Sequence, residues 1–307
     1  MVTVTKWLVT GAGGFFGANA GAFLNGRVES VGAFRSLAAS SLFGTNVSID
    51  LRSGSSIYEV VDAVRPDVVV HAAALASHEA CESDPALAQL VNVESTKHLA
   101  RACTDVGAKL VYLSTDAVFD GSRGNYTEKD ATNPFSVYGT TKLLGEQAAL
   151  AIHEDVLIAR TNFFGWSPSG TRSILEFFVN ALRSGQQVSG YTDFVVSSLY
   201  VQDLLSAIYD LVGSGRRGVV HLGASNALSK YHFGVQVASQ FGLDAELISP
   251  VTAAVGGHAN SRARDLSLNT SLMESCLGRS IPTQEFGIAS AYDDESAVAP
   301  RVTGFRE

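Results

Sequence analysis

A short apolar segment that runs into a glycine-rich turn restricts the fold of this chain more than any other feature. Residues 6–10 (KWLVT) have the length and composition of a buried strand, and a helical pattern follows the turn through Leu24. Between them, Gly11 permits a tight turn, Gly14 lets another group approach the backbone, and Gly17 allows the helix to pack closely on the strand. The N–H groups and partial positive charge of a helix N-terminus bind phosphate. The segment therefore predicts a phosphate-binding strand–turn–helix unit, and a glycine turn without a ligand is the alternative.

Short apolar runs alternate with helical patterns along the first half of the chain. Strands that are apolar throughout and separated by helices indicate a parallel sheet with helices on both faces. We therefore expect an α/β fold with a doubly wound parallel sheet of the Rossmann type. The predicted strands are residues 6–10, 30–34, 46–49, 68–72, 109–113 and 156–159, and the predicted helices lie near 53–64, 85–103 and 136–153.

Composition and charge exclude several classes of protein. The chain is 46% hydrophobic, which is ample for a core, and its net charge of −8 provides no basic surface for nucleic acid or anionic lipid. No apolar run reaches the ~18 residues of a membrane helix, and the first strand leaves no room for a signal peptide. Cys81, Cys103 and Cys276 are too widely spaced for a disulfide framework or a zinc site. We expect a soluble, cytoplasmic protein without a metal site and without a nucleic-acid or membrane partner.

A dinucleotide at the glycine turn would need a residue at the end of the second strand to bind the adenosine ribose. An acidic residue there would accept the 2′-hydroxyl of NAD, but this chain has Arg35 and Ser36, a cation and a hydroxyl suited to a 2′-phosphate. We therefore expect NADP(H) as the preferred cofactor. NAD(H) stays open as the alternative, in which Arg35 is an ordinary surface residue. Asp50 and Leu51 follow the third strand and could cover the adenine.

Tyr138 and Lys142 are four residues apart and share one face of the predicted helix at 136–153. A free phenol has a pKa of about 10 and is a poor acid–base catalyst at neutral pH, whereas a nearby cation favours the phenolate and lowers that pKa. The segment Ser114–Asp116, with Thr115 at its centre, directly follows the strand at 109–113, and ligands bind at the carboxyl ends of strands in open α/β sheets. These three residues are therefore candidates for a reactive site, with a surface Tyr–Lys pair as the alternative.

With these residues in place, the chain resembles the extended short-chain dehydrogenase/reductase family. Within that family it is similar to the branch of dTDP-4-dehydrorhamnose reductase and related nucleotide-sugar ketoreductases. The matching segments span most of the chain and are TGAGGFFG (10–17), HAAA (71–74), CESDPALAQLVNVEST (81–96), LSTDAVFDG (113–121), YTEKD (126–130), VYGTTKLLGE (137–146), ARTNFFG (159–165) and RARDLSLNT (262–270).

The resemblance implies a catalytic triad of Thr115, Tyr138 and Lys142. In that family pattern Tyr138 would give a proton to the carbonyl oxygen while NADPH delivers hydride to the carbon. Lys142 would also hold the nicotinamide ribose, and Thr115 would position the substrate. The cofactor-binding residues that the resemblance implies are Gly11, Gly14, Phe15, Phe16, Gly17, Arg35, Ser36, Asp50, Leu51, Ala72, Ala73, Ala74, Asn92, Tyr138 and Lys142.

Candidates for substrate binding lie in the segments that follow the sheet strands. Asn162 could bind a diphosphate or a sugar, or cap a turn. Three loop arginines, Arg172, Arg262 and Arg264, could form bidentate contacts with a pyrophosphate or remain solvated. The candidate set is Thr115, Asp116, Asn162, Arg172 and Arg262.

Two positions depart from the reductase pattern. Ala117 stands where an aromatic residue is usual, and Arg262 is followed by Ala263 where the pattern has proline. Both positions are expected near the sugar, so they bear on the substrate rather than on reduction. Asp116 followed by Ala117 also lacks the acidic pair with which nucleotide-sugar 4,6-dehydratases eliminate water, so dehydration is not expected.

Beyond Arg160 the pattern of the chain loosens. An amphipathic helix is predicted at 172–183, and segments at 195–201, 203–212 and 219–222 have the pattern of one more crossover that rejoins the sheet. The expected division is an NAD(P)-binding domain at 1–165 and a smaller, interleaved C-terminal substrate-binding region at 166–307, of which about 195–222 returns to the sheet.

The sequence therefore predicts NADPH-dependent reduction of a keto group on a nucleotide-activated sugar, in the form of a dTDP-linked 4-keto-6-deoxy sugar. Two alternatives stay open: an epimerase of the same fold that recycles a tightly held NAD, and a non-catalytic regulatory subunit. Arg35 argues against the first, and the presence of Thr115, Tyr138 and Lys142 argues against the second. The expected partner is the nucleotide sugar, and a homodimer is left open.

Overall fold

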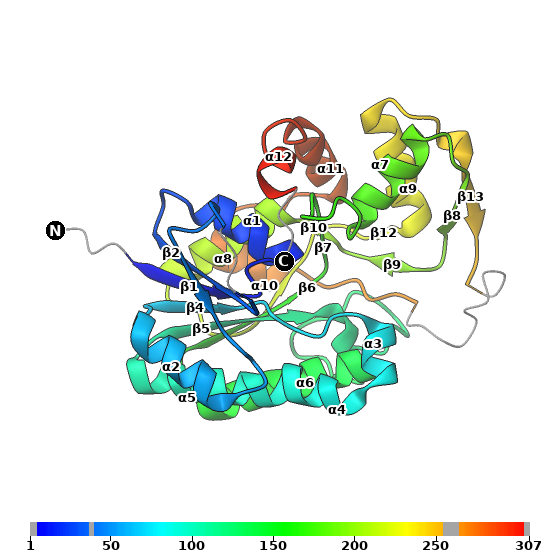
Figure 1. Cartoon of the computed structure of the whole chain (residues 1–307). Helices are drawn as coiled ribbons and strands as arrows, with labels where there is room; N and C mark the ends of the chain where they lie inside the picture. The colour runs from blue at the N-terminus through cyan, green and yellow to red at the C-terminus, as the bar shows by residue number, and fades with distance from the viewer. Residues whose placement is uncertain (1–4, 37–39, 254–263, 304–307) are drawn as a thin grey trace.

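A parallel sheet of seven strands, in the order β11-β6-β5-β4-β1-β2-β3, lies at the centre of the computed structural model (Figure 1), which describes residues 5–36, 40–253 and 264–303. From β1 the chain adds β2 and β3 toward one edge of the sheet, and from β4 it adds β5, β6 and β11 toward the opposite edge. The carboxyl ends of β1 and β4 therefore form the switch point at which open α/β sheets bind ligands. The predicted doubly wound sheet is confirmed. Its strands are β1 (Lys6–Thr10), β2 (Glu29–Phe34), β3 (Thr45–Ser48), β4 (Val68–His71), β5 (Lys109–Thr115), β6 (Val156–Thr161) and β11 (Gly218–Leu222).

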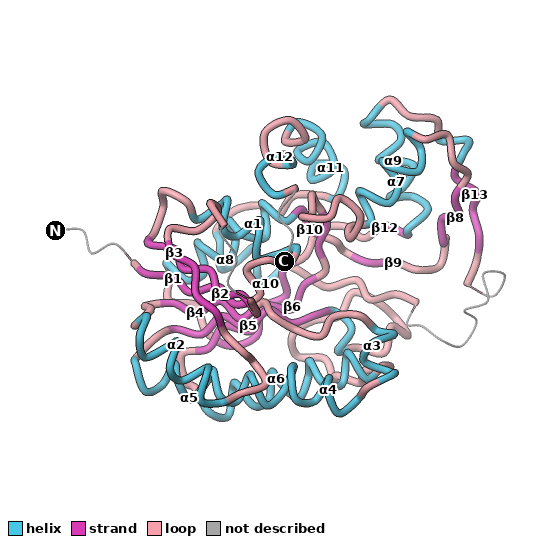
Figure 2. The backbone as a smooth tube through the Cα atoms, viewed as in Figure 1, coloured by secondary structure: helices cyan, strands magenta, loops and turns pink. Residues whose placement is uncertain are grey.

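Helices cover both faces of this sheet (Figures 1 and 2). One face carries α2 (Gly54–Val64), α5 (Ser95–Val106) and α6 (Val137–Ile152), and the other carries α1 (Phe15–Leu24) and α8 (Val201–Gly213). Successive strand residues point to opposite faces, so Leu8 packs in the cluster under α2 and α5 while Val9 packs in the cluster under α1 and α8. Both side chains are fully buried. This two-sided burial explains why the strands read as continuous apolar runs.

The predicted helix at 85–103 is divided in the structure. It consists of α4 (Pro85–Gln89), a π-helical segment η1 (Leu90–Glu94) and α5. A further helix, α3 (His78–Ser83), precedes it where no helix was predicted. Asp84 is both the last cap of α3 and the first cap of α4, which explains the break between them.

The C-terminal half contributes to the central sheet and also forms a separate lobe. Strand β11 pairs with β6, and α8 packs on α1, so part of the second half returns to the main sheet. The segment at 195–201 does not: it is divided into two short strands that pair with β12 and β7 instead of the central sheet. The remaining elements are β7 (Phe163–Phe164), β8 (Val188–Tyr191), β9 (Val195–Val196), β10 (Leu199–Tyr200), β12 (Leu228–Ser229), β13 (Ile248–Val251), α7 (Ile174–Arg183), α9 (Lys230–Phe241), α10 (Ser271–Leu277), α11 (Gln284–Asp293), α12 (Ala299–Val302), η2 (Asp116–Val118) and η3 (Ala245–Leu247). The division of the chain at residue 165 stays a prediction.

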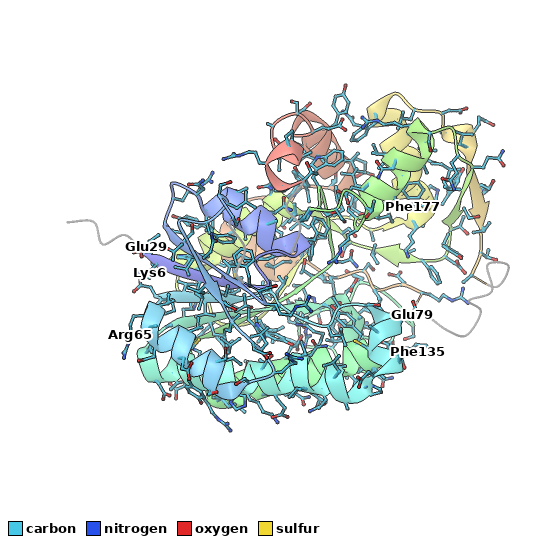
Figure 3. All side chains as sticks on the ribbon, in the orientation of Figure 1. Lys6, Glu29, Arg65, Glu79, Phe135 and Phe177 are labelled. Carbon is cyan, nitrogen blue, oxygen red and sulfur yellow. The ribbon has the colours of Figure 1, made fainter. Side chains whose placement is uncertain are left out.

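Side chains of the lobe extend outward as well as toward the sheet, with Phe177 of α7 among the exposed aromatic residues in Figure 3. Within the described ranges, no helix is long and apolar enough to cross a membrane.

The turn between β1 and α1 has no room for a side chain at its last glycine. A Cβ atom on Gly17 would overlap the carbonyl oxygen of Gly11 and lie 2.6 Å from the Cα atom of Ala12. Gly17→Ala should therefore lower the free energy of unfolding by about 1–3 kcal/mol or more, because backbone atoms must move. Urea denaturation measures this change. Gly213→Ala is the matched control, since a Cβ atom there meets nothing within 4 Å. Equal stability of the two variants would contradict the packing described here.

Candidate active site

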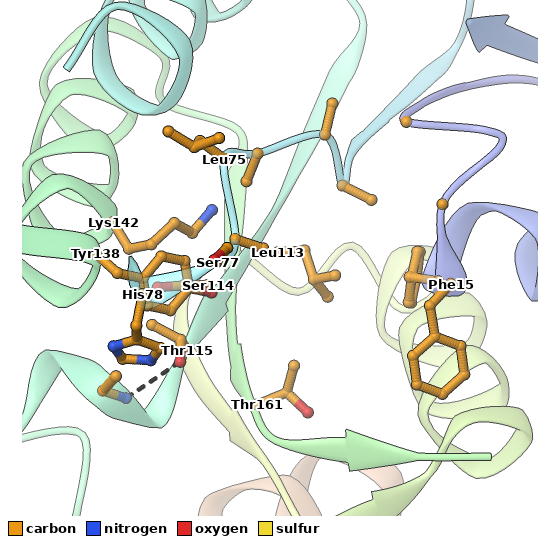
Figure 4. A pocket seen from close by; sticks show the side chains of 18 of the residues that line it. Phe15, Leu75, Ser77, His78, Leu113, Ser114, Thr115, Tyr138, Lys142 and Thr161 are labelled. Atoms are coloured by element: carbon orange, nitrogen blue, oxygen red, sulfur yellow. Dashed lines mark hydrogen bonds between the residues drawn. The ribbon is translucent and has the colours of Figure 1, made fainter. Parts of the chain in front are cut away.

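A cavity of about 1180 Å³ extends along the carboxyl ends of the central strands (Figure 4). Its floor is formed by the glycine turn after β1 and by residues that follow β4, β5 and β6. Its far wall is formed by the C-terminal half, through Phe194, Lys230 and Arg264. Drug-sized ligands occupy pockets of roughly 300–1,000 Å³, so this cavity has room for two ligands side by side.

One end of the cavity is formed by the N-terminus of α1. The residue that precedes this helix is Gly14, and no side chain caps the helix there, which leaves its first N–H groups available to a ligand. Gly11 has a φ of +69°, and a Cβ atom on it would lie 2.8 Å from the Cα atom of Ala73. The turn after β1 and the segment after β4 therefore approach each other as closely as backbones allow. Their small residues, among them Ala72, Ala73 and Ala74, keep this part of the cavity open.

The ends of β2 and β3 form the adjoining wall. Arg35 and Asp50 line the cavity there as predicted, together with Leu51 and Arg52. The predicted contact of Asp50 with an adenine competes with Arg52, whose guanidinium donates hydrogen bonds to the Asp50 carboxylate at 3.0 and 2.9 Å. These bonds lower the pKa of Asp50. Arg52 was missed because an Asp–Arg pair two residues apart in a loop has no recognisable sequence pattern.

Thr115, Tyr138 and Lys142 meet on the cavity wall, with Thr115 at the end of β5 and the other two in the first turns of α6 (Figure 4). Helix α6 begins here because the Ser136 hydroxyl accepts a hydrogen bond from the N–H of Gly139 at 3.1 Å. His78 of α3 lies against Tyr138, with 4.9 Å between ring centroids. No sequence signal pointed to His78, because its contact with Tyr138 depends on the packing of α3 against α6.

Lys142 is only 3% exposed, and its Nζ atom lies 3.9 Å from the centroid of the Tyr112 ring. Burial lowers the pKa of Lys142 to about 7, although the negative charge of Glu146 acts in the opposite direction. Glu146 is itself held by a buried ion pair with Arg160, with 2.8 Å between Nη2 and Oε2. The ammonium group is therefore close to its titration point at neutral pH.

The pKa of the Tyr138 phenol shifts in the direction opposite to the prediction. From the sequence we expect Lys142 to lower this pKa, but desolvation raises the pKa of Tyr138 to about 12, and the negative charge of Asp116 adds to this effect. Hydrogen bonding with Thr115 acts the other way and does not outweigh desolvation. Tyr138 therefore carries its proton throughout the neutral range.

Asp116 is the most deeply buried acid of the cavity wall, at 3% exposure. The Thr115 hydroxyl donates to its Oδ1 atom at 3.0 Å, and the Asn162 amide donates to its Oδ2 atom at 2.9 Å. Burial raises the pKa of Asp116 to about 6 against the effect of these bonds. Asn162 thus lines the cavity and binds a neighbouring side chain, and Ser198 in turn donates to its Oδ1 atom at 2.5 Å.

The wall opposite the sheet supplies cations. Arg172 and Arg264, two of the three arginines considered for a pyrophosphate, line the cavity together with Lys230. The charged groups of Lys230 and Arg264 lie 5.4 and 5.9 Å from the Phe194 ring centroid. Arg262, the other predicted arginine, lies outside the described residues. Lys230 and Phe194 were missed because both come from segments without a sequence pattern of their own, brought to the cavity by the fold.

Two predicted residues lie away from the cavity. Ser36 is exposed and is not part of its lining. Asn92 is buried, where it accepts a hydrogen bond from the N–H of Leu75 at 2.8 Å and donates to Thr141 at 3.0 Å. Its side chain therefore ties the segment after β4 to α6. Asn92 would act on a ligand only indirectly, by holding the segment that contains Leu75, since Leu75 lines the cavity and Asn92 does not.

In the described part of the chain, no group of His, Cys, Asp and Glu is arranged to hold a metal ion.

Lys142→Met tests the cost of burying the ammonium group. A lysine whose pKa is lower in the folded protein binds fewer protons there, so its contribution to stability rises with pH between the folded value of about 7 and the ordinary 10.5. Below pH 7, Lys142→Met should therefore raise the free energy of unfolding by on the order of a few kcal/mol. This gain over the wild type should shrink as the pH rises toward 10.5.

Denaturant titrations over this pH range measure the difference between the two proteins. The exposed Lys129 provides the control, since Lys129→Met should change stability little at any pH. A stability difference between Lys142→Met and wild type that does not vary with pH would refute the lowered pKa.

The family model described as the RmlD substrate binding domain matches residues 5–297 of the chain. A probable low-salt glycan biosynthesis reductase, Agl14, from Haloferax volcanii is 30% identical over 81% of this chain and 85% of its own length. A dTDP-4-keto-6-deoxy-D-glucose reductase from Streptomyces niveus is 33% identical over 84% of this chain and 86% of its own length. The solved structure of dTDP-4-dehydrorhamnose reductase from Bacillus anthracis in complex with NADP has a TM-score of 0.86 at 25% identity, and the match covers 95% of this chain and 100% of that one.

Proposed function

We propose, because the chain belongs to the RmlD substrate binding domain family, that it is an NADPH-dependent oxidoreductase of the extended short-chain dehydrogenase/reductase type that reduces a keto group on a nucleotide-activated sugar. The observation that carries this proposal is one cavity with the N-terminus of α1 at one end and Thr115, Tyr138 and Lys142 further along its wall. The finer proposal is a dTDP-linked 4-keto-6-deoxy sugar as substrate, which the name of the Streptomyces niveus relative supports.

The lining of the cavity fits NADPH at three points. The glycine turn excludes side chains where a pyrophosphate would lie, and the N-terminus of α1 offers N–H groups to it. Arg35, exposed at the end of β2, offers a guanidinium to a 2′-phosphate. Bound NADPH would supply a hydride to the carbonyl carbon. The residues proposed to hold it are Gly11, Gly14, Phe15, Phe16, Gly17, Arg35, Asp50, Leu51, Ala72, Ala73, Ala74, Tyr138 and Lys142.

Tyr138 is proposed as the general acid. Its raised pKa keeps the phenol protonated at neutral pH, and the developing alkoxide of a reduced ketone is a much stronger base than phenolate, so the proton moves to the substrate oxygen. Lys142 in its charged form would stabilise the phenolate that remains and contact the nicotinamide ribose. Thr115 lies beside both Tyr138 and the cavity, where its hydroxyl would contact the carbonyl oxygen.

The substrate would occupy the part of the cavity between the sheet and the C-terminal half. Arg172, Lys230 and Arg264 are proposed to neutralise its diphosphate, and Asp116 and Asn162 lie at the sugar end. On this account residues 1–165 hold the cofactor and residues 166–307 supply most of the substrate wall.

Turnover of keto-sugar nucleotides with NADPH tests the proposal. Stoichiometric loss of NADPH absorbance, with one alcohol formed per NADPH, is expected for at least one member of a panel that varies the base and the sugar. An epimerase would change the substrate without net consumption of NADPH. A regulatory subunit would bind without turnover, and either of these results across the whole panel would overturn the proposed function.

Removal of the Tyr138 hydroxyl tests its role as the acid. Tyr138→Phe should lower kcat by roughly 10²–10⁴-fold, which is the usual contribution of a positioned acid. The Kd for NADPH, measured by fluorescence titration, should stay nearly constant because the ring and Lys142 remain. Turnover at the wild-type rate in this variant would exclude the mechanism.

Reversal of charge at the end of β2 tests the choice of cofactor. Arg35→Asp should lower the ratio of kcat/KM for NADPH to that for NADH by about tenfold to a hundredfold, because a charge-assisted bond to the 2′-phosphate contributes about 1.5–3 kcal/mol. Arg101→Asp, an exposed arginine on α5 outside the cavity lining, is the control and should leave the ratio at the wild-type value. A ratio that is the same in all three proteins would disprove the assignment of Arg35.

A further inference from the structure

The direction of the hydrogen bonds around Thr115 limits what its hydroxyl can do. A threonine hydroxyl has one proton to donate. In the structure this proton points to Asp116 Oδ1 at 3.0 Å, and the Thr115 oxygen accepts from the N–H of Ala117 at 3.1 Å. The second of these bonds is the dashed line in Figure 4. While this arrangement holds, Thr115 has no proton left for the Tyr138 oxygen, with which it also hydrogen-bonds, or for a ligand in the cavity.

The far side of Asp116 is held by an amide of fixed orientation. Asn162 donates through Nδ2 to Asp116 Oδ2 at 2.9 Å, and Ser198 donates to the other end of the same amide at 2.5 Å. Oδ2 therefore already accepts a hydrogen bond, and a proton placed on it would face the N–H group of Asn162. A proton added to Asp116 would reside on Oδ1, the oxygen that faces Thr115.

Protonation at Oδ1 would reverse the bond between the two side chains. Asp116 would then donate to the Thr115 oxygen, which can accept it in addition to the N–H of Ala117. The hydroxyl proton of Thr115 would be released toward the cavity, which Thr115 and Asp116 both line, where the Tyr138 oxygen and a bound ligand are its two acceptors.

We propose that Asp116 is a positioning residue that sets the donor direction of Thr115. Its protonated carboxyl group makes Thr115 a second hydrogen-bond donor, beside Tyr138, to the carbonyl oxygen of the substrate. Its carboxylate form withdraws that donor and leaves Tyr138 alone. The inference rests on the proposed function, since it concerns the same reduction.

The surroundings of Asp116 place this change near neutral pH. Burial raises its pKa to about 6, and the bonds from Thr115 and Asn162 oppose the shift without cancelling it. The negative charge of Asp116 raises the pKa of Tyr138, which belongs to α6. On the other side of Asp116, Asn162 and Ser198 are neutral. Apart from Arg35, Asp50 and Arg52 at the ends of β2 and β3, the other titratable and charged groups that line the cavity are His78, Lys142, Arg172, Lys230 and Arg264.

Asp116→Asn is the informative variant, because an asparagine can donate to Thr115 through Nδ2 and accept from Asn162 through Oδ1. It reproduces the hydrogen bonds of the protonated acid and does not titrate. In the wild type, kcat/KM for reduction should fall about tenfold per pH unit above the pKa of Asp116, with kcat changing more than KM, toward the level of Thr115→Ala. Asp116→Asn should lack the part of this fall that Asp116 causes, and should exceed the wild type about tenfold at one pH unit above that pKa. The titration of Lys142 near pH 7 acts on both proteins and does not distinguish them.

A double variant distinguishes an effect of Asp116 on the hydrogen-bond direction of Thr115 from an effect of Asp116 on the structure of the site. If Asp116 acts through Thr115, Thr115→Ala/Asp116→Asn should have the same pH profile as Thr115→Ala. The inference is overturned if Asp116→Asn retains the wild-type fall, or if it loses activity at every pH to the level of Thr115→Ala.

Infrared spectroscopy tests the same group without turnover. The wild type should show the C=O stretch of a protonated carboxyl group below the pKa of Asp116 that disappears above it, is absent in Asp116→Asn and persists in Tyr138→Phe. This band together with no turnover of any keto-sugar nucleotide would overturn the proposed function and leave the protonation of Asp116 established. Absence of the band, or a band that Asp116→Asn retains, would overturn the inference whatever the turnover.

Discussion

Desolvation at the carboxyl edge of the sheet is the constraint on which the reactive groups of this protein depend. Lys142 and Asp116 are each 3% exposed, and both have lost the water that would stabilise their charged forms. Their pKa values move toward each other, to about 7 and about 6, while the pKa of Tyr138 moves up to about 12. A cation, an acid and a phenol are thus held in one wall at protonation states that suit delivery of a proton.

The close contact between the glycine turn and β4 provides the space beside that wall. Gly11 approaches Ala73 so closely that only a glycine fits, and Gly17 lets α1 pack against the turn. These contacts direct the N-terminus of α1 into the same cavity that Tyr138 lines. A phosphate-bearing cofactor at one end and a keto group at the other therefore need no movement of the sheet to meet.

The parts of the fold that follow from local pattern were predictable. The strands of the sheet are continuous apolar runs in the sequence because helices cover both faces of the sheet. The turn from Gly11 to Gly17 was identified because its glycines stand at the positions where the backbone packing leaves no room for a side chain. The break of a predicted helix at the π-helical segment Leu90–Glu94 was not predictable. There Asn92 turns inward to bond with Leu75 and Thr141, partners far away in sequence.

The site shows the same division between local and long-range determinants. Tyr138 and Lys142 were identified because one helix turn separates them, and Thr115 because it ends a strand. The raised pKa of Tyr138 and the chain of bonds from Asp116 through Asn162 to Ser198 depend on four segments meeting in space. The cations of the far wall depend likewise on how the C-terminal half folds back over the sheet.

The central claim is that this cavity transfers a hydride to a carbonyl carbon of a nucleotide sugar while a side chain of the protein protonates the oxygen. Mass and NMR analysis of the product formed with NADPH deuterated at the transferable position tests it most directly. We expect one deuterium on the carbon that bears the new hydroxyl group, and none elsewhere in the sugar. A product without deuterium, or an altered sugar formed while the labelled NADPH remains intact, would contradict it.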